Sequence, residues 1–559
     1  MRRGALTLMT WTPWLAALLW AALALGCGPG APEGAGGAGQ DLAQDLAQAA
    51  SLAPDLKARQ ARVAALCGLA AKAAATAPDL GMRFCAQALE QAAGLYDPAL
   101  RALAERLRAA ADSAGDPGRR ETLAAAGGEM EGYCLRVWPL RLVAEAALAV
   151  APDIAAQALN QALMNLGLNK GPGRDQDLAG LALVVARREP ARARALAGQV
   201  ADPGQRSRLW RELARGTNQP QDLEAAAAAA RQIADPSAGA RALAAAALDR
   251  WELDPEGGRA LFAEARDLAG REPDPARQAL ALGEAAALLA QADPRQGLEE
   301  ARALPALGGA RFKALRRAAL AYLGSDPERA KWALAEAARQ VDLLPSPAER
   351  WQAWALLAKD AASSDPALAR ELIAQLPAGE RLLRDEALSA LVLAETGAGL
   401  DQALERVRRM DDPQAQVALL LRLAAIHGRQ RPELGRALQE EALDLALARG
   451  GDQARLALAP VWAGIEPSKG VDIALGIGEN VARARALATV AKILAAQGRT
   501  AGARWSLDLA LEALAGISPK QMLDKVRLLG DMGREWAPLE GRESRRLFEL
   551  GADAAGKMG

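Results

Sequence analysis

The sequence predicts an all-α protein, an α-α superhelix (solenoid) of about thirteen helical hairpins. Three observations support this fold class. Ala and Leu dominate the 559 residues and aromatic residues make up 3%, a composition that favours helices. A turn signal built around Pro returns about every 35 residues. Between these turns, apolar residues recur at steps of three and four, the spacing of one helix face.

The recurring turn signal is Asp-Pro or a close variant, as in Asp365-Pro366. Asp at a helix N-cap accepts hydrogen bonds from the free amides of the first turn, and Pro suits the next position because no N–H is needed there. The residue before Pro disfavours helix, so the same pair ends the preceding helix. We expect these turns at Pro78, Pro117, Pro152, Pro190, Pro220, Pro255, Pro294, Pro327, Pro366, Pro432 and Pro467, and Pro-free turns at 395–401 and 497–502.

A second set of turns interleaves with the first, at Pro203, Pro236, Pro275, Pro347, Pro377 and Pro413. Each repeat is therefore predicted to contain helix A, an Asp-Pro turn, helix B and a second short turn. The stretches 349–362 and 366–376 show the helical spacing of apolar residues in one such pair. One hairpin cannot bury its apolar face alone, so neighbours must stack. We expect an open, right-handed array over residues 41–559, with an irregular patch at 115–134 and a loop at 165–176.

The first 26 residues differ from the rest of the chain. A basic start precedes an apolar run at 14–26, which is short for a membrane span and has the length of a signal-peptide core. The Gly-rich stretch 27–40 has the composition of a flexible tether. We interpret residues 1–26 as a signal peptide. A plain secretory signal and an uncleaved anchor that reaches back to Leu6 are the alternatives.

The stretch Leu23–Cys27 resembles the lipobox of bacterial lipoproteins, in which a small residue precedes the Cys that receives the lipid. It departs from the family pattern at Ala24, where Leu is preferred. The resemblance implies a lipoprotein-type signal peptide, acyl chains such as palmitate on Cys27, and a mature protein anchored to the membrane of the bacterial cell envelope. By the sorting habit of this family, Gly28 after the Cys implies the outer membrane, facing the periplasm.

The remaining cysteines, Cys67, Cys85 and Cys134, are odd in number. Cys67 and Cys85 lie symmetrically about the turn at 76–79, and symmetric positions of an antiparallel helix pair face each other. The sequence leaves two alternatives open. Either a disulfide joins Cys67 to Cys85 and leaves Cys134 unpaired, or both residues are buried thiols.

The array of hairpins resembles the α-solenoid families, TPR first and HEAT next. The turn-to-turn spacing ranges from 30 residues (190 to 220) to 39 residues (78 to 117), whereas TPR units keep about 34. The Leu-Gly pair of TPR helix A occurs at Leu282-Gly283. The resemblance implies a superhelical scaffold that binds protein or peptide partners.

The sequence offers little material for catalysis. Its one histidine, His427, stands at a predicted helix end, where interaction with the helix dipole explains it. One His and no Cys-x-x-Cys pair give no metal or haem ligand set, and phosphate-loop and hydrolase motifs are absent from the sequence. We therefore predict no enzyme activity, no cofactor and no metal. The alternative is an α/α-toroid enzyme that acts on envelope glycans with a pair of carboxylates.

Aromatic and basic residues provide the candidates for binding. Trp210, Trp351 and Trp354 lie in predicted A helices away from the turns, and they are the candidate partner-binding residues. A second aromatic set recurs near the turns, and we expect it in the core: Trp251, Tyr322, Trp332, Trp462 and Trp505. Arg recurs near the start of helix A, at Arg206, Arg241, Arg277, Arg311, Arg350 and Arg381. We expect these residues to pair with cap Asp residues of neighbouring repeats. The alternative is a basic ladder that binds an acidic ligand.

The charge balance restricts the kind of partner. Lys plus Arg and Asp plus Glu are both 68, so the formal net charge is zero, which argues against nucleic acid. The sequence therefore predicts a lipid-anchored scaffold or adaptor of the cell envelope that binds protein or peptide partners. A purely structural spacer is a further hypothesis.

Overall fold

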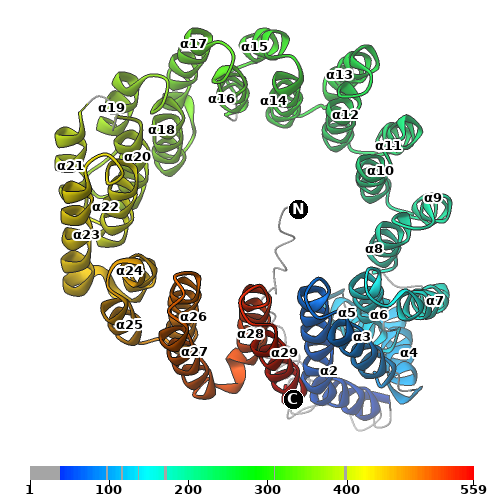
Figure 1. Cartoon of the computed structure of the whole chain (residues 1–559). Coiled ribbons are helices and arrows are strands. Elements are labelled where there is room, and N and C mark those ends of the chain that lie inside the picture. The colour runs from blue at the N-terminus through cyan, green and yellow to red at the C-terminus, as the bar shows by residue number, and fades with distance from the viewer. Residues whose placement is uncertain are drawn as a thin grey trace, which may run out of the picture. The chain divides into compact units, whose positions relative to one another are not determined.

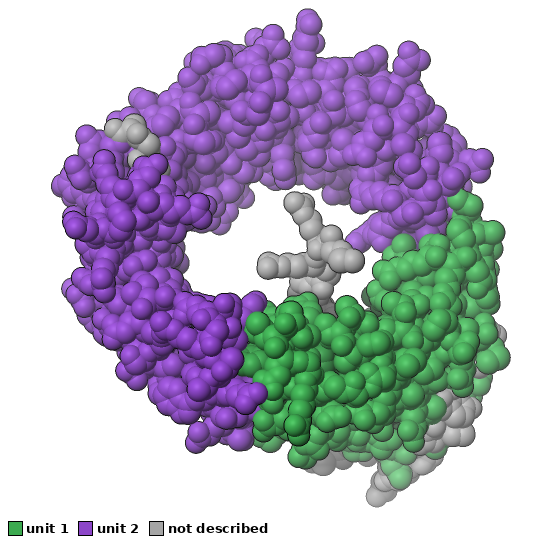
Figure 2. Space-filling view, in the orientation of Figure 1, with its two compact units in different colours: residues 1–200, 517–559 green, residues 201–516 purple. Residues whose placement is uncertain are grey.

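The protein is all-α in the part of the chain that the computed structural model describes, residues 38–95, 98–114, 117–135, 137–168, 173–307, 309–395 and 399–558. Within these ranges every regular element is a helix and no strand occurs (Figure 1). The residues group into two compact units (Figure 2). Unit 1 runs up to Val200 and resumes at Ile517, and unit 2 comprises residues 201–516. The predicted fold class is confirmed.

The helices of unit 1 come from two stretches of the sequence, one before and one after unit 2. They are α2 (Ala38–Ala73), α3 (Pro78–Ala93), α4 (Pro98–Ser113), α5 (Pro117–Leu135), α6 (Val137–Ala147), α7 (Pro152–Leu168), α8 (Arg174–Ala186), α9 (Pro190–Gly198), η3 (Pro519–Gln521), α28 (Met522–Trp536) and α29 (Gly541–Gly556).

The helices of unit 2 follow one another without interruption by other structure. They are α10 (Pro203–Thr217), α11 (Pro220–Arg231), α12 (Pro236–Trp251), α13 (Pro255–Ala269), α14 (Pro275–Ala292), α15 (Pro294–Ala303), α16 (Ala310–Tyr322), α17 (Pro327–Ala338), η1 (Val341–Leu343), α18 (Pro347–Ala361), α19 (Pro366–Ala374), α20 (Arg381–Glu395), α21 (Leu400–Arg408), α22 (Pro413–His427), α23 (Pro432–Leu445), η2 (Ala446–Gly450), α24 (Gly451–Ile465), α25 (Pro467–Leu475), α26 (Asn480–Ala496) and α27 (Thr500–Ala515). Successive helices pack as hairpins, α2 with α3, α4 with α5 and so on to α28 with α29. The predicted series of helical hairpins is confirmed.

The Asp-Pro turns begin helices in the way the sequence predicts. The Asp365 carboxylate accepts a hydrogen bond from the amide of Leu368 at 3.0 Å, and Pro366 is the first residue of α19. The same cap is formed by Asp202, Asp235, Asp254, Asp274, Asp293, Asp326 and Asp412. Each cap satisfies an amide that the helix itself leaves without a partner. Pro377 is an exception, because α20 begins later, at Arg381.

A small residue lies three positions after the first Pro of most B helices, at the point where the two helices of a hairpin cross. The position is Gly in α13, α15, α23 and α25, and Ala in α17 and α19. A Cβ atom added to Gly470 in α25 would lie 2.5 Å from the backbone nitrogen of Ala463 in α24. No side chain fits at that distance, so the crossing requires Gly there.

The hairpins of unit 2 build two layers. The even-numbered helices from α10 to α26 form one layer and the odd-numbered helices form the other (Figure 1). We call these the A layer and the B layer. Neighbouring A helices also contact each other, as α12, α14 and α16 do. One core cluster runs from Ala286 on α14 to Leu391 on α20 without a break. This is the shared core that stacking repeats require.

Helix α2 joins several parts of unit 1. Pro54 lies inside this helix, and the residues before and just after it, such as Leu46 and Leu56, pack with Leu103 of α4 and Leu123 of α5. Helix α2 also contacts α3, α6, α28 and α29. In Figure 1 the red helices α28 and α29 lie beside the blue helix α2.

The contact between the first and last hairpins is close. A Cβ atom on Gly530 of α28 or on Gly551 of α29 would lie 2.9 Å from Cδ2 of Leu69 in α2. Lys72 Nζ donates a hydrogen bond to the carbonyl oxygen of Arg527 at 2.8 Å. The sequence predicted an open array, in which the first and last hairpins each have one neighbour. That expectation is corrected by these contacts within unit 1.

Two local expectations are also corrected. The stretch 115–134 is not irregular, because α5 occupies it from Pro117 onward. Gly127 lies where a Cβ atom would be 3.2 Å from the carbonyl oxygen of Ala104 in α4, so this Gly marks close helix packing. The loop expected at 165–176 is shorter, since α7 continues to Leu168 and α8 begins at Arg174. Helix α2 begins at Ala38, inside the predicted tether, and residues 1–37 lie outside the described residues.

The crossing of α24 and α25 gives a test of this packing. We expect Gly470→Ala to lower the free energy of unfolding by about 1–3 kcal/mol, because the new methyl group overlaps the backbone of Ala463. Chemical denaturation followed by circular dichroism measures the change.

The matched control lies in the same hairpin. Gly464, on α24, has no atom within 4 Å of an added Cβ, so Gly464→Ala should be neutral or stabilising by up to about 1 kcal/mol. Equal effects of the two substitutions would contradict the packing role of Gly470.

Candidate functional site: a groove on the A layer of unit 2

A hollow of unit 2 lies on its A layer, across helices α12, α14, α16 and α18. Its volume is about 510 Å³, within the range of about 300–1,000 Å³ that is usual for binding pockets. Its walls carry Arg241, Leu280, Gly283, Glu284, Ala287, Leu288, Gln291, Ala310, Phe312, Lys313, Arg316, Arg317 and Leu356. We call this hollow the A-layer groove.

Small residues create the groove. Gly283 of α14 lies so close to Ala310 of α16 that an added Cβ would be 3.0 Å from the Cβ of Ala310. Because Gly283, Ala287 and Ala310 project little or no side chain, the surface is hollow between the larger Leu280 and Leu356. Thus Gly283 of Leu282-Gly283, the pair that resembles TPR helix A, lies at the contact between two neighbouring A helices.

A break in the repeat pattern accompanies the groove. Pro305 lies in the turn before α16, but it does not begin the helix as Pro275 and Pro347 begin α14 and α18. That turn instead uses Gly309, whose φ of 72° is in the left-handed region, and α16 starts at Ala310 without a side-chain cap. Gly adopts this conformation without strain. Helices α20, α24 and α26 also begin without Pro, so this departure alone does not locate the groove.

The rim of the groove carries an excess of positive charge. Of its cations, Arg241 pairs with Glu284 at 3.5 Å, and Arg316 pairs with Asp360 of α18. Lys313 and Arg317 are exposed, and within the described residues their side chains have no hydrogen bond or ion pair. They are four positions apart on α16, so they project from the same side of that helix.

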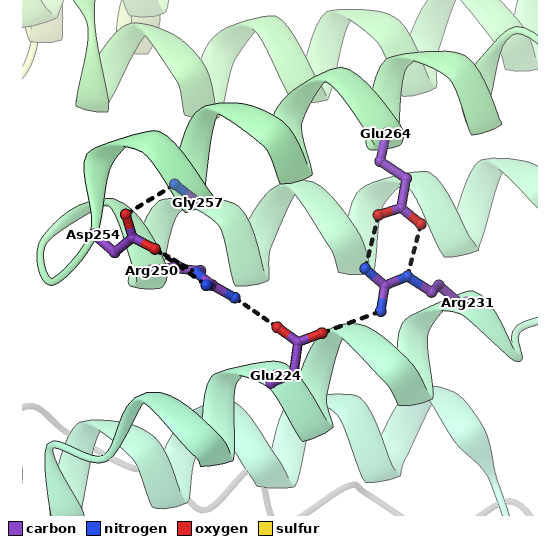
Figure 3. A network of polar contacts seen from close by, with 6 residues as sticks. All are labelled: Glu224, Arg231, Arg250, Asp254, Gly257 and Glu264. Atoms are coloured by element: carbon purple, nitrogen blue, oxygen red, sulfur yellow. Dashed lines mark hydrogen bonds and ion pairs between the residues drawn. The ribbon is translucent and has the colours of Figure 1, made fainter.

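A polar network holds the repeats next to the groove in register (Figure 3). Arg231 of α11 donates two hydrogen bonds, of 2.7 and 2.8 Å, to the Glu264 carboxylate on α13. Glu224 of α11 accepts from Arg250 of α12 at 2.6 Å, and Arg250 also donates to Asp254, which caps α13. The network therefore ties three consecutive helices together.

The ion pair between an Arg on one B helix and a Glu on the next B helix recurs in other repeats. Arg266 pairs with Glu300 at 2.8 Å, and Arg408 pairs with Glu441 at 2.7 Å. The partners are 34 and 33 residues apart, close to one repeat length. Each pair therefore joins a B helix to the equivalent position of the next B helix.

These pairs lower the pKa of their carboxyl groups. The hydrogen bonds from Arg408 hold the pKa of Glu441 below its ordinary value, and those from Arg231 do the same for Glu264. Asp385 differs, because burial raises the pKa of its carboxyl group. Asp385 accepts a hydrogen bond from the amide of Asp412 at 2.8 Å, which links α20 to the turn before α22.

The Arg residues near the start of the A helices have mixed partners. Arg277 pairs with the cap residue Asp235 of the preceding repeat at 2.7 Å, as expected. Arg241 and Arg311 pair instead with Glu284 and Glu336, which are not caps. The expected pairing with cap Asp residues is thus correct for Arg277 and wrong for Arg241 and Arg311.

The candidate Trp residues do not line the groove. Trp351 and Trp354 are half-buried on α18, against the core cluster of unit 2, and Trp210 is half-buried on α10. Their role in partner binding stays a prediction.

The second aromatic set is divided between the core and the surface. Trp462 and Tyr322 are buried as expected, with exposures of 2% and 5%. Trp332 and Trp505 are 40% and 54% exposed, so the expectation of core packing is wrong for them. The repeat spacing gives the positions of these two Trp residues along their helices. It does not show whether a neighbouring helix covers their side chains.

Cys67 on α2 and Cys85 on α3 are buried, free thiols in the structure. Burial raises the pKa of both thiols, for Cys85 to about 11. The disulfide between them stays a prediction. The side chain of Cys134 and all of Cys27 lie outside the described residues. His427 is the last residue of α22, as expected.

The described residues contain neither a cluster of metal ligands nor a membrane span. Among them, no group of three or more His, Cys, Asp or Glu side chains is placed to hold a metal ion. None of the described helices combines the length and apolar character of a membrane span.

Fold and groove together define an all-α repeat protein of the solenoid class. No protein-family model and no curated protein matches the chain. Two solved structures are similar at 16% identity. One is Ton1535 from Thermococcus onnurineus NA1, with 62% of this chain and 96% of that chain covered and a TM-score of 0.25. The other is a circular tandem repeat protein with novel repeat topology and enhanced subunit contact surfaces, with 82% and 95% covered and a TM-score of 0.15. At these TM-scores neither similarity bears on function.

The ion pairs of the B layer predict a pH dependence of stability. Because the folded-state pKa of Glu441 lies below the ordinary value of 4.5, its stabilisation is complete above that pH and is lost as the pH falls through the folded-state pKa. Glu441→Gln should therefore lower the free energy of unfolding at pH 7 by about 0.5–1 kcal/mol, and the loss should be smaller at pH 3. Urea denaturation at the two pH values measures this difference.

Asp385→Asn is the control of opposite sign. Since burial raises the pKa of Asp385, its ionised form disfavours the folded state at pH 7, and Asn keeps an acceptor for the Asp412 amide. The variant should be as stable as the parent at pH 7 or more so. A larger loss in Asp385→Asn than in Glu441→Gln would contradict this assignment.

Proposed function

We propose that this protein is a non-catalytic scaffold or adaptor that binds protein or peptide partners in the A-layer groove. The observation that carries the proposal is the groove itself, an apolar hollow with two exposed cations that the described residues leave without a partner. Apolar walls with a few oriented polar groups are typical of binding sites. A structural spacer has no need of such a hollow.

The composition of the groove favours binding over glycan chemistry. Glycosidases use two carboxyl groups about 5–9.5 Å apart, and many aromatic rings hold their sugar substrates. Among the residues that line the groove, Glu284 is the one carboxylate and Phe312 the one aromatic residue. Glu284 is also paired with Arg241. These features support the scaffold hypothesis over the α/α-toroid enzyme.

The proposed location rests on the N-terminal sequence alone. The apolar run at 14–26, the lipobox-like Leu23–Cys27 and the Gly-rich tether indicate a lipoprotein of the bacterial cell envelope. We propose attachment to the outer membrane through acyl chains on Cys27, with the solenoid in the periplasm. The partners would then be envelope proteins or peptides.

Site-specific crosslinking in cells tests the binding surface. Leu356 lines the groove and is 38% exposed, and Leu447 is a similarly exposed Leu of unit 2 outside it, at 53%. A photoreactive residue at position 356 should give discrete adducts with a specific partner, and one at 447 should not. If both positions give the same adducts, or if the purified protein degrades a cell-wall glycan, the proposal fails.

Substitution of Cys27 tests the anchor. The wild-type protein should fractionate with membranes, and its intact mass should match a chain that starts at acylated Cys27. Cys27→Ser should remove the acyl chains and block cleavage, while the helix content stays unchanged. An unmodified wild-type N-terminus would contradict the anchor and leave the groove unaffected.

A further inference from the structure

We infer that the occupant of the A-layer groove is an acidic peptide segment of another protein, with apolar side chains beside its carboxylates. This inference rests on the proposed function and names the chemistry of the partner. The walls of the groove contain four cationic side chains, Arg241, Lys313, Arg316 and Arg317, and one carboxylate, Glu284. Such an excess of positive charge selects a negatively charged partner.

Two of these cations are already neutralised. Arg241 is paired with Glu284, and Arg316 with Asp360. Lys313 and Arg317 are the cations left over, and both are exposed on the same side of α16. They are one helical turn apart, so two carboxylates with a similar spacing would match them.

The apolar walls exclude a bare anion as the natural occupant. Leu280, Leu288, Phe312 and Leu356 surround the hollow, and a phosphate or nucleotide phosphate has nothing to place against them. A membrane surface presents charged headgroups first, and its acyl chains would have to leave the bilayer to reach the hollow. A peptide can present apolar side chains and carboxylates together.

Peptide binding to the full-length chain tests the inference. The acidic probe is a helical peptide of about fifteen residues built from Ala, Leu and Glu. The second probe replaces each Glu with Gln, and the third replaces each Glu with Lys. Fluorescence anisotropy measures affinity, which we expect to be highest for the acidic probe and to weaken as salt is raised.

Charge variants locate the binding site. Lys313→Gln combined with Arg317→Gln should weaken binding of the acidic probe about tenfold, because two exposed ion pairs are lost. Arg429→Gln combined with Arg449→Gln removes two exposed charges of unit 2 outside the groove and should leave the affinity unchanged. Lys313→Glu combined with Arg317→Glu should shift the preference to the Lys probe. Thermal denaturation checks that every variant is folded.

Several results would overturn the inference. One is equal affinity for the Glu and Gln probes. Another is an equal loss of affinity for the acidic probe in the groove variant (Lys313→Gln with Arg317→Gln) and in the control variant (Arg429→Gln with Arg449→Gln). Binding of anionic-lipid vesicles that is lost in the same groove variant would assign the site to lipid. A dimer of this chain that Leu356→Asp dissociates would assign it to a second copy. If crosslinks from position 356 identify a partner that binds without acidic residues, the inference fails and the proposed function stands. If position 356 gives no specific crosslink, the proposed function fails.

Discussion

The close crossing of the two helices in each hairpin is the contact on which the other features depend. Most B helices start at Pro, and Asp often caps them. The small residue three positions later meets the A helix, as Gly470 meets Ala463. The short distance between the helices brings their apolar stripes together and lets the next hairpin stack on both. Ala and Gly, which contribute little hydrophobic area, are therefore valuable here because they permit dense packing.

Ion pairs determine how neighbouring hairpins align after this packing is set. The bonds from Arg231 to Glu264 and from Arg408 to Glu441 join equivalent positions of successive B helices. Each pair is partly exposed and contributes modestly, but with Arg266–Glu300 three such pairs restrain sliding along the B layer. On the A layer, Arg241–Glu284 joins α12 to α14 and Arg316–Asp360 joins α16 to α18. Lys313 and Arg317 of α16 remain without a partner among the described residues, beside the groove.

Local patterns predicted the local structure. The caps, the turns and the order of helices follow from residues close in sequence, so Asp365-Pro366 was informative by itself. The contact of Leu69 with Gly530 and Gly551 joins residues more than 450 positions apart, and no pattern near Leu69 signals it. The sequence did not single out the groove cations either. Lys313 and Arg317 resemble every other solvent-exposed Lys and Arg until their neighbours in space are known.

The packing of α2 against α28 and α29 makes the stability of unit 1 depend on synthesis of the chain through α29. Solenoids usually shield their end faces with special capping repeats, whereas here the first and last hairpins shield each other. On the ribosome, the surface around Leu69 stays exposed until residues 530 and 551 have been made, more than 450 residues later. A truncated product would keep that surface exposed, a mark by which chaperones and proteases distinguish unfinished chains from finished ones.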